Sequence, residues 1–589
     1  MTAPAGPLHV RWLGRVPYNE ALALQQALFR YGTVNHLLLL EHPHVFTYGS
    51  RADLAGNVLV DPDSVGAELI AVNRGGDVTY HGPGQLVGYP IVSLAAKHGG
   101  RAGPADTVAH VRNVEQLIID ALAELGLSTA GRLSEYPGVW IDPLGPNPRK
   151  ICAIGVRVSR GRTMHGFGLN VTTDMRYMRE YIVPCGIADK PVTSLAEEGI
   201  SATLAEVVEI VTQLAAHRWG TGLAERQDVA WWQRPEDLSA FSRGEGPGAP
   251  VRSSRDHGIN APLAPDDDRS ERGGRSERVE PVRLLGRLAQ AGVGIGVGIG
   301  VGDGVALAAR KPEWLRPKVR IGPEVLALKR TVRDLNLITV CEEAGCPNLS
   351  ECWADGTATL MVLGERCTRA CGFCLVDTRK PTLPDEGEPE RVAEAVARMD
   401  LAHAVLTMVA RDDLSDGGMA HVAACVRAIR RQRPGTRIET LISDAKGDSA
   451  SLQLLFAARP DVLNHNLETV PRLQRAVRPS AGYARSLGVL ARAKSHELVV
   501  KSGLVVGMGE TSDEVVGVLT DLASIGVDIV TIGQYLRPTS HHLPVDRWIE
   551  PAEFVRWKQL GEQAGIGHVE ASPLTRSSYH ARQSANAIS

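Results

Sequence analysis

Short apolar runs alternate with helix-like stretches along the last third of the chain. The apolar runs predict strands at residues 404–409, 437–442, 462–466, 499–506, 529–532 and 568–571. Between them, apolar positions recur at helical spacing in residues 422–431, 483–494 and 513–525. This alternation of β and α favours a parallel sheet with helices outside, as in a barrel.

Polar residues follow three of these predicted strands. Reacting groups of parallel barrels gather at the C-terminal strand ends. The polar residues there are candidates for contacts with a ligand, but ordinary loops carry such residues as well. They are Arg411, Asp412 and Asp413, then Asn464, Asn466 and Glu468, and finally residues 507–510 with the sequence GMGE.

The first 225 residues show other patterns. Residues 150–158 alternate as a strand, and residues 106–125 repeat apolar side chains as the core-facing side of a helix does. The most specific stretch is RGGDVTYHGPGQ at residues 74–85, whose glycines let a backbone approach a ligand closely. It lacks the Gly-x4-Gly-Lys-Ser/Thr pattern of nucleotide-binding loops.

Composition divides the chain. At 589 residues it is too long for one core. Residues from about 227 to 309 are charged and rich in Pro and Gly, ending in GVGIGVGIGVGDGV. That run is too short and too glycine-rich for a membrane span of about 20 apolar residues, so a flexible linker is predicted. We therefore expect independent cores at 1–225 and 310–589, joined by a linker at 226–309.

Six of the nine cysteines lie between residues 341 and 374. Cys367, Cys371 and Cys374 have a Cys-x3-Cys-x2-Cys spacing that can bind three irons of a cubane cluster and leave the fourth iron open. Cys-x4-Cys-x5-Cys just upstream predicts a second three-thiolate set. Disulfides are disfavoured because the chain starts MTAPAGPLHVRW, without the apolar segment of a secretory signal. Zinc is the stronger alternative, although its sites usually come as paired Cys-x2-Cys units.

The region from about Arg310 onward resembles lipoyl synthase of the radical S-adenosylmethionine superfamily. The resemblance rests on CTRACGFC, CEEAGCPNLSECW, GTATLMVLG and RSSYHA. It implies a partial (βα)6 barrel, S-adenosylmethionine and two 4Fe-4S clusters. The cluster that binds S-adenosylmethionine would be held by Cys367, Cys371 and Cys374. The auxiliary cluster, which gives up its sulfur, would be held by Cys341, Cys346, Cys352 and Ser578.

The first part resembles lipoyl-protein octanoyltransferase, through PGVW at 137–140, KICAIG at 150–155, HGFGLN at 165–170 and PCGI at 184–187. The implied fold is the α/β domain shared with biotin and lipoate protein ligases. Cys185 would be the nucleophile and Lys150 its proton acceptor, because a thiolate attacks thioesters and a lysine in an apolar pocket loses its preference for charge. Cys152, beside Lys150, is interpreted as a packing residue.

The same resemblance assigns the acyl tunnel, in which glycines would leave room for an eight-carbon chain. Its lining is expected to be Arg74, Gly75, Gly76, Asp77, Val78, Thr79, Tyr80, His81, Ala153, Ile154, Gly155, Gly166, Phe167 and Gly168.

Together the two resemblances predict a bifunctional lipoylation enzyme, an acyltransferase and a sulfurtransferase in one chain. The first half would move octanoyl from octanoyl-acyl carrier protein to a lysine of a lipoyl domain. The second would insert sulfur at C6 and C8, whose unactivated carbons require radical chemistry. Expected partners are lipoyl domains of 2-oxoacid dehydrogenases, the glycine cleavage H protein and an electron donor.

Two alternatives remain open. The N-terminal half could be an ATP-dependent lipoate ligase, or one half could be retained as a carrier-docking module. The net charge of −3 gives no electrostatic case for nucleic acid. We expect no membrane partner and a cytoplasmic location.

Overall fold

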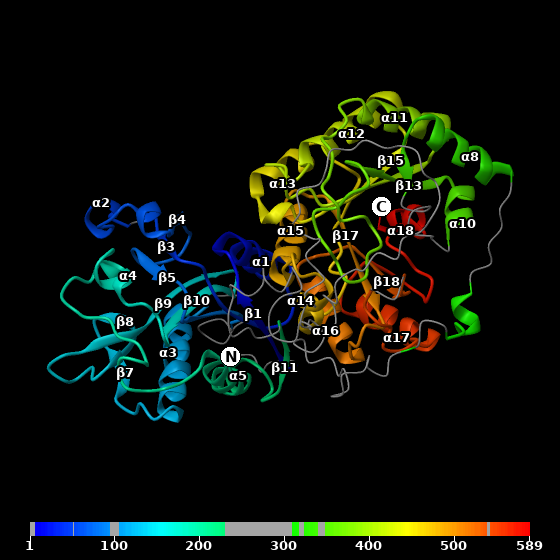
Figure 1. Ribbon diagram of the computed structural model, residues 1–589. Coiled ribbons are helices and arrows are strands. Elements are labelled where there is room, and N and C mark those ends of the chain that lie inside the picture. The colour runs from blue at the N-terminus through cyan, green and yellow to red at the C-terminus, as the bar shows by residue number, and fades with distance from the viewer. Residues whose placement is uncertain are drawn as a thin grey trace, which may run out of the picture.

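The computed structural model describes residues 6–50, 52–94, 105–229, 305, 309–316, 323–339, 348–538 and 542–588. They form two α/β domains that lie side by side, blue to green and green to red in Figure 1. Most of the predicted linker at 226–309 lies outside the described residues, as do Cys341 and Cys346. Within the described residues, no helix combines the length and apolarity needed to cross a membrane.

The N-terminal domain is built on an eight-stranded mixed sheet with the order β11-β1-β2-β6-β10-β9-β8-β7. The strand β11 extends this sheet past residue 225, where the domain was expected to end. The strands are β1 (Leu8–Arg15), β2 (His36–Glu41), β6 (Gln85–Ile91), β7 (Ala130–Leu133), β8 (Tyr136–Ile141), β9 (Arg149–Ser159), β10 (Arg162–Asn170) and β11 (Ala224–Asp228). A smaller sheet holds β3 (Val45–Tyr48), β4 (Glu68–Ala71) and β5 (Thr79–His81).

Helices cover both faces of the larger sheet. Leu37 and Leu39 of β2 join the apolar cluster of α3 and α5, whereas Leu38 and Leu40 join that of α1, because successive strand residues point to opposite faces. The predicted helix at 106–125 and strand at 150–158 are both confirmed, as α3 and β9. The helical elements are α1 (Tyr18–Tyr31), α2 (Leu54–Asn57), η1 (Pro62–Val65), α3 (Thr107–Glu124), α4 (Arg176–Arg179), η2 (Pro184–Gly186) and α5 (Leu204–Trp219).

The C-terminal domain contains the predicted parallel sheet. Strands β13 to β19 pair in parallel in chain order, and β12 adds an antiparallel edge. All six predicted strands are present, and β13 is a seventh parallel strand that the sequence pattern did not predict. The strands are β12 (Ile338–Thr339), β13 (Thr357–Val362), β14 (His403–Met408), β15 (Arg437–Leu441), β16 (Val462–Asn464), β17 (Val499–Val506), β18 (Ile529–Gln534) and β19 (His568–Ala571).

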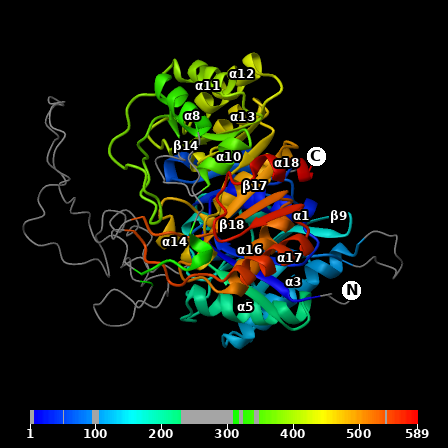
Figure 2. The same ribbon diagram turned by 90° about the vertical axis from the view of Figure 1, so that its right-hand side faces the viewer.

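Helices lie on the outside of this sheet in both views (Figures 1 and 2). The three predicted helices are confirmed as α12, α15 and α16. The helical elements are η3 (Glu313–Leu315), α8 (Pro323–Asp334), α10 (Leu349–Ala354), α11 (Glu388–Arg398), α12 (Met419–Gln432), η4 (Ala445–Gly447), α13 (Ser449–Phe456), η5 (Pro471–Leu473), α14 (Gln474–Val477), α15 (Tyr483–Ser495), α16 (Ser512–Ser524), α17 (Pro551–Gln563) and α18 (Ala581–Ile588).

The two domains share a packed boundary. Helix α1 of the N-terminal domain contacts α15 of the barrel, and one buried apolar cluster includes Leu24 and Leu28 together with Leu487 and Leu490. The sequence predicted independent cores separated by a linker. That expectation was wrong, because α1 presents apolar side chains to its own sheet and to the barrel at once.

Candidate active sites

A cavity in the N-terminal domain collects nearly all the predicted tunnel residues. It is lined from the loop before β5 and from β5, β9 and β10, and Cys185 opens onto it. Of the predicted set, Val78 and Tyr80 do not line the cavity; they belong to an apolar cluster with Phe46 and Met178 on the other side. Strand alternation explains this, because Thr79 and His81 face the cavity while their neighbours face away.

Lys150 and Cys185 meet beside this cavity. The Lys150 Nζ lies 3.7 Å from the Cys185 Sγ, and 5.1 Å from the centre of the Trp140 ring. The Lys150 side chain is buried, and Gly138 packs so closely that a Cβ there would come within 3.0 Å of the lysine Cε. An apolar, aromatic wall therefore holds the amine against the thiol.

The backbone at Cys185 is in the left-handed region, with φ of 59°. A non-glycine residue there costs on the order of 1–3 kcal/mol, and such residues cluster at functional sites. The turn η2 is fixed by the Cys185 N–H, which donates to the Val78 carbonyl over 2.7 Å. The strained turn thus points the thiol at the cavity.

Charged residues of the glycine-rich stretch shape the cavity rim. Arg74 donates to the Thr47 carbonyl at 2.8 Å and to the Asp77 carbonyl at 3.0 Å, and burial lowers its pKa. Asp77 accepts hydrogen bonds from the Val78 N–H at 2.6 Å and from Asn57 at 3.0 Å. These side chains are used to hold their own loop in place.

Two of the glycines that line the cavity are also required for packing against neighbouring protein atoms. A Cβ at Gly166 would collide with the Gly88 carbonyl oxygen, and one at Gly168 would come within 2.8 Å of the Gln85 Oε1. Cys152 lies in the apolar core and burial raises its pKa, which agrees with a packing role.

Three cavity residues were missed by sequence reasoning: Tyr18 at the start of α1, Tyr89 of β6 and His165 of β10. The motif HGFGLN alone does not indicate that its histidine, His165, faces the cavity. Burial lowers the pKa of His165 to about 4 and that of His81 to about 3. Both rings are therefore neutral near pH 7, so they add no charge to a cavity that Arg74 and Asp77 also line.

In the barrel, Cys367, Cys371 and Cys374 lie on residues 366–378, here called the thiol loop, which follows β13. Burial, reinforced by neighbouring thiols, raises the pKa of Cys371 to about 11 and that of Cys374 to about 12. Thiols in this setting ionise when a bound cation compensates the charge.

The donor set fits a 4Fe-4S cluster, in which each thiolate binds a different iron. In the described part of the chain, no three Cys, His, Asp or Glu side chains converge as ligands of one metal ion. The loop itself is fixed by backbone bonds, including the Cys367 N–H to the Asp377 carbonyl at 2.7 Å.

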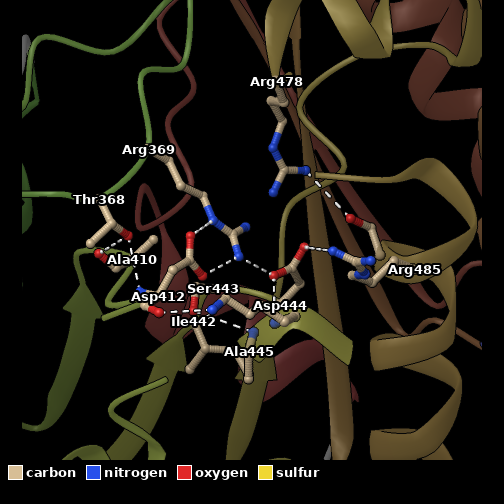
Figure 3. A network of polar contacts seen from close by, with 12 residues as sticks. Thr368, Arg369, Ala410, Asp412, Ile442, Ser443, Asp444, Ala445, Arg478 and Arg485 are labelled. Atoms are coloured by element: carbon tan, nitrogen blue, oxygen red, sulfur yellow. Dashed lines mark hydrogen bonds and ion pairs between the residues drawn. The ribbon is translucent and has the colours of Figure 1, made fainter. Parts of the chain in front are cut away.

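A polar network pins the thiol loop to the strand ends (Figure 3). Arg369 donates to both carboxylate oxygens of Asp412 at 2.7 Å and to Asp444 at 2.6 Å. Asp412 follows β14, as predicted, and Asp444 follows β15. Burial alone would raise the pKa of Asp444, but the Arg369 charge prevails and lowers it to about 2.

The other predicted strand-end residues are also placed at this end of the barrel. Arg411 pairs with Asp413 at 2.8 Å, and Asn464 bonds the Glu439 carboxylate at 2.9 Å. The Glu510 carboxylate accepts the Met508 N–H at 3.0 Å, and burial raises its pKa to about 7. The Glu510 side chain therefore stabilises the loop of residues 507–510 through a hydrogen bond to the backbone of that loop.

The segment RSSYHA at residues 576–581 lies at the same C-terminal end of the barrel strands. Asn466 donates to Glu468 at 3.0 Å and to Ser577 at 2.7 Å, and burial raises the pKa of Glu468. This link ties the residue before Ser578 to the loop after β16.

Ser578 and Cys352 belong to segments that contact each other. Tyr579 donates to Glu351 at 3.3 Å, and Glu351 precedes Cys352 in α10. The structure therefore brings two of the predicted auxiliary ligands to one junction. The remaining two, Cys341 and Cys346, lie outside the described residues.

Comparisons with protein families give three matches. The lipoyl protein ligase A/B catalytic domain matches residues 17–215. The N-terminal domain of lipoyl synthase matches residues 303–346, and the radical SAM superfamily matches residues 361–522. A solved bi-partite lipoate protein ligase from Thermoplasma acidophilum covers 40% of this chain and 90% of that chain, at 20% identity and a TM-score of 0.30.

Individual relatives match the C-terminal half. A lipoyl synthase of Rubrobacter xylanophilus is 54% identical over 275 residues, which are 46% of this chain and 86% of the relative. A lipoyl synthase of Mycobacterium tuberculosis is 53% identical over 272 residues, 46% of this chain and 88% of the relative. The chain belongs to the lipoyl synthase family, with a lipoyl protein ligase A/B catalytic domain fused ahead of its radical SAM domain.

Proposed function

We propose that this chain octanoylates lipoyl domains with its N-terminal domain, about residues 1–225 extended by β11, and inserts sulfur into the octanoyl chain with residues 310–589. The donor would be octanoyl-acyl carrier protein. The acceptors would be lipoyl domains of 2-oxoacid dehydrogenases and the glycine cleavage H protein. The observation that carries the first half is the contact between Lys150 and Cys185 at the cavity.

The transfer proceeds in two balanced steps. Lys150 takes the Cys185 proton as the sulfur attacks the thioester carbonyl, and it passes that proton to the carrier sulfur, which leaves as a thiol. The amine of the target lysine then attacks the Cys185 thioester, and the amide forms as the Cys185 sulfur departs. Lys150 accepts the proton of the amine and returns it to that sulfur. The contact between the Lys150 Nζ and the Cys185 Sγ, at 3.7 Å, places the amine within reach of the proton in both steps.

A covalent role for Cys185 favours a transferase over an ATP-dependent ligase, because a ligase has no use for this thiol. Incubation of the full chain with octanoyl-acyl carrier protein, without ATP, should give an octanoyl thioester on Cys185, seen by intact mass. If octanoylation of a lipoyl domain required ATP and no such thioester formed, the ligase alternative would replace the proposal.

In the second half, Cys367, Cys371 and Cys374 would hold a 4Fe-4S cluster, and Cys341, Cys346, Cys352 and Ser578 an auxiliary one. With S-adenosylmethionine and an electron donor, the first cluster would supply the radical chemistry that unactivated C6 and C8 require. The chain's own contribution is positional: Arg369, Asp412 and Asp444 fix the thiol loop at the strand ends.

The decisive experiment follows one lipoyl domain by intact mass. It is mixed with the full chain, octanoyl-acyl carrier protein, S-adenosylmethionine and a strong reductant. We expect the octanoyl form to appear first and then to convert to the lipoyl form. A domain that stays unmodified contradicts the first half, and one that stops at octanoyl contradicts the second.

A further inference from the structure

A buried ion pair crosses the boundary between the two domains. Arg11 of β1 and Asp521 of α16 approach to 2.7 Å, and their side chains are 2% and 5% exposed. Tyr483 of α15 donates to the same carboxylate at 2.8 Å, and Arg11 also pairs with Glu225 at 2.7 Å. Separating the two domains would leave these buried charges without their partners, which is energetically costly.

A second charged contact joins α1 to α15. Glu20 accepts from the Arg485 Nε at 2.7 Å, and its side chain is 7% exposed. Arg492 on the same helix donates to the Asn19 carbonyl at 3.1 Å and to the Gly447 carbonyl at 3.0 Å. The turn η4 is therefore held between the two domains.

From Arg485 the contacts continue to the thiol loop. Its Nη1 lies 3.9 Å from the Asp444 Oδ2, and the other Asp444 oxygen accepts from Arg369 at 2.6 Å. Figure 3 shows Arg485 and Arg369 on opposite sides of Asp444. Glu20, Arg485, Asp444 and Arg369 thus form a polar relay of alternating charges that begins in the N-terminal domain and ends between Cys367 and Cys371.

The relay depends on Glu20 for a physical reason. Asp444 is fully buried, and Arg485 is the cation that faces its second oxygen. Arg485 itself is 24% exposed, so it can turn toward solvent unless its Nε is held. Glu20 holds it. The nearby Lys446 donates instead to the Asp412 carbonyl at 2.8 Å, which braces the other side of the same network.

We propose that Glu20 and Arg485 are positioning residues for the thiol loop, so that the docked N-terminal domain helps to order the cluster site of the barrel. The helix α1 that carries Glu20 also places Tyr18 in the acyl cavity, which makes one helix common to both sites. The consequence for cluster chemistry rests on the proposed function of the second half, whereas the ordering of the loop does not.

The first test measures hydrogen–deuterium exchange of the full chain without iron. Glu20→Gln and Arg485→Gln should each speed exchange in peptides covering residues 366–378 by at least about threefold, because local opening becomes easier. Arg485→Lys keeps the charge and should restore part of the protection. Lys494→Gln is the matched control, since Lys494 lies on the same helix, is 22% exposed and pairs with Asp528 at 2.6 Å away from the relay.

The second test uses the reconstituted protein. Glu20→Gln should alter the electron paramagnetic resonance spectrum of the reduced cluster with S-adenosylmethionine bound. It should also slow the cleavage of S-adenosylmethionine by about three- to tenfold, because a small displacement of reacting groups lowers the rate. Octanoyl transfer should continue, because Glu20 does not line the acyl cavity. Wild-type chain that cleaves no S-adenosylmethionine would contradict the proposed function and leave the exchange result intact.

A protease site inserted between residues 269 and 280 gives an independent measurement if Glu20→Gln does not fold. After cleavage of the folded chain, the two fragments should co-elute and the thiol loop should stay protected; separating them by dilution should remove that protection. The proposal is overturned if separated fragments keep the loop protected, or if Arg485→Gln speeds exchange while a folded Glu20→Gln does not.

Discussion

The acyl cavity and the C-terminal end of the barrel differ in the groups that would carry their chemistry. The cavity holds its reacting groups in the chain itself, with Lys150 and Cys185 in contact and its histidines neutral. The barrel mouth is a network of charges around three thiols. Where side chains carry the chemistry, the fold brings the reacting groups into contact; where a cofactor carries it, the protein supplies position and counter-charge.

The sharpest division is expected between the two cysteine sets. Cys371→Ala should abolish cleavage of S-adenosylmethionine, because it removes one ligand of the cluster that binds it. Cys352→Ala should leave 5′-deoxyadenosine formation detectable while lipoyl product disappears. Chromatography of the nucleoside and intact mass of the lipoyl domain measure the two outcomes. Equal loss of cleavage in both folded variants would refute the division of roles.

The acyl site should fail independently of the barrel. Cys185→Ser and Lys150→Ala should each slow octanoyl transfer by about 10³-fold or more, because nucleophile and base act as a unit. S-adenosylmethionine cleavage should persist, and an already octanoylated lipoyl domain should still acquire sulfur. Cys152→Ala is the matched thiol control and should retain transfer. Near wild-type transfer by Cys185→Ser would exclude the covalent mechanism.

The boundary between the two domains can be weakened by a substitution that lies in neither candidate site. Asp521→Asn leaves the Arg11 charge in a buried position and should lower the free energy of unfolding by about 3 kcal/mol. Asp528→Asn is the control: its Lys494 pair is partly exposed, so a loss of about 1 kcal/mol or less is expected. Urea denaturation followed by fluorescence gives both values. Equal losses would show that burial of the Arg11 pair adds nothing.

The neutral His81 ring in the cavity should make the stability of the folded protein sensitive to acid. Burial lowers the pKa of His81 to about 3 in the folded protein. In the unfolded chain this side chain binds a proton as pH falls below about 6.5, whereas in the folded protein it stays neutral until about pH 3. The contribution of neutral His81 to the free energy of unfolding is therefore fully present above about pH 6.5 and is lost as pH falls toward 3. His81→Gln should therefore reduce the destabilisation between pH 7 and pH 5 by about 2 kcal/mol.

Denaturation curves at the two pH values test this prediction. His217→Gln, on an exposed position of α5, should leave the difference between the curves unchanged. Asp444 makes the contrast with the barrel, since the Arg369 charge lowers its pKa to about 2 and it stays ionised throughout. An unchanged acid sensitivity in His81→Gln would mean that this ring is protonated in the fold.

The sequence by itself predicted a great deal of this protein. The period of apolar residues was enough for six parallel strands, for α3 and for β9, because strand and helix burial leave periods of two and 3.6. The spacing of Cys367, Cys371 and Cys374 indicated a cluster loop, since these ligands are local in the chain. PCGI and KICAIG nominated Cys185 and Lys150 by resemblance, and the structure brings them together.

Tertiary structure decided what depends on residues distant in the chain. Tyr18 and Tyr89 reach the acyl cavity, and Gly166 and Gly168 accommodate protein atoms, through packing that no local pattern encodes. The polar relay joins Glu20 to Arg485 across 465 positions. Local periodicity fixes which face of an element is buried, but the partner of that face is chosen by the whole packed core. For that reason the two catalytic domains looked separate in the sequence and are docked in the fold.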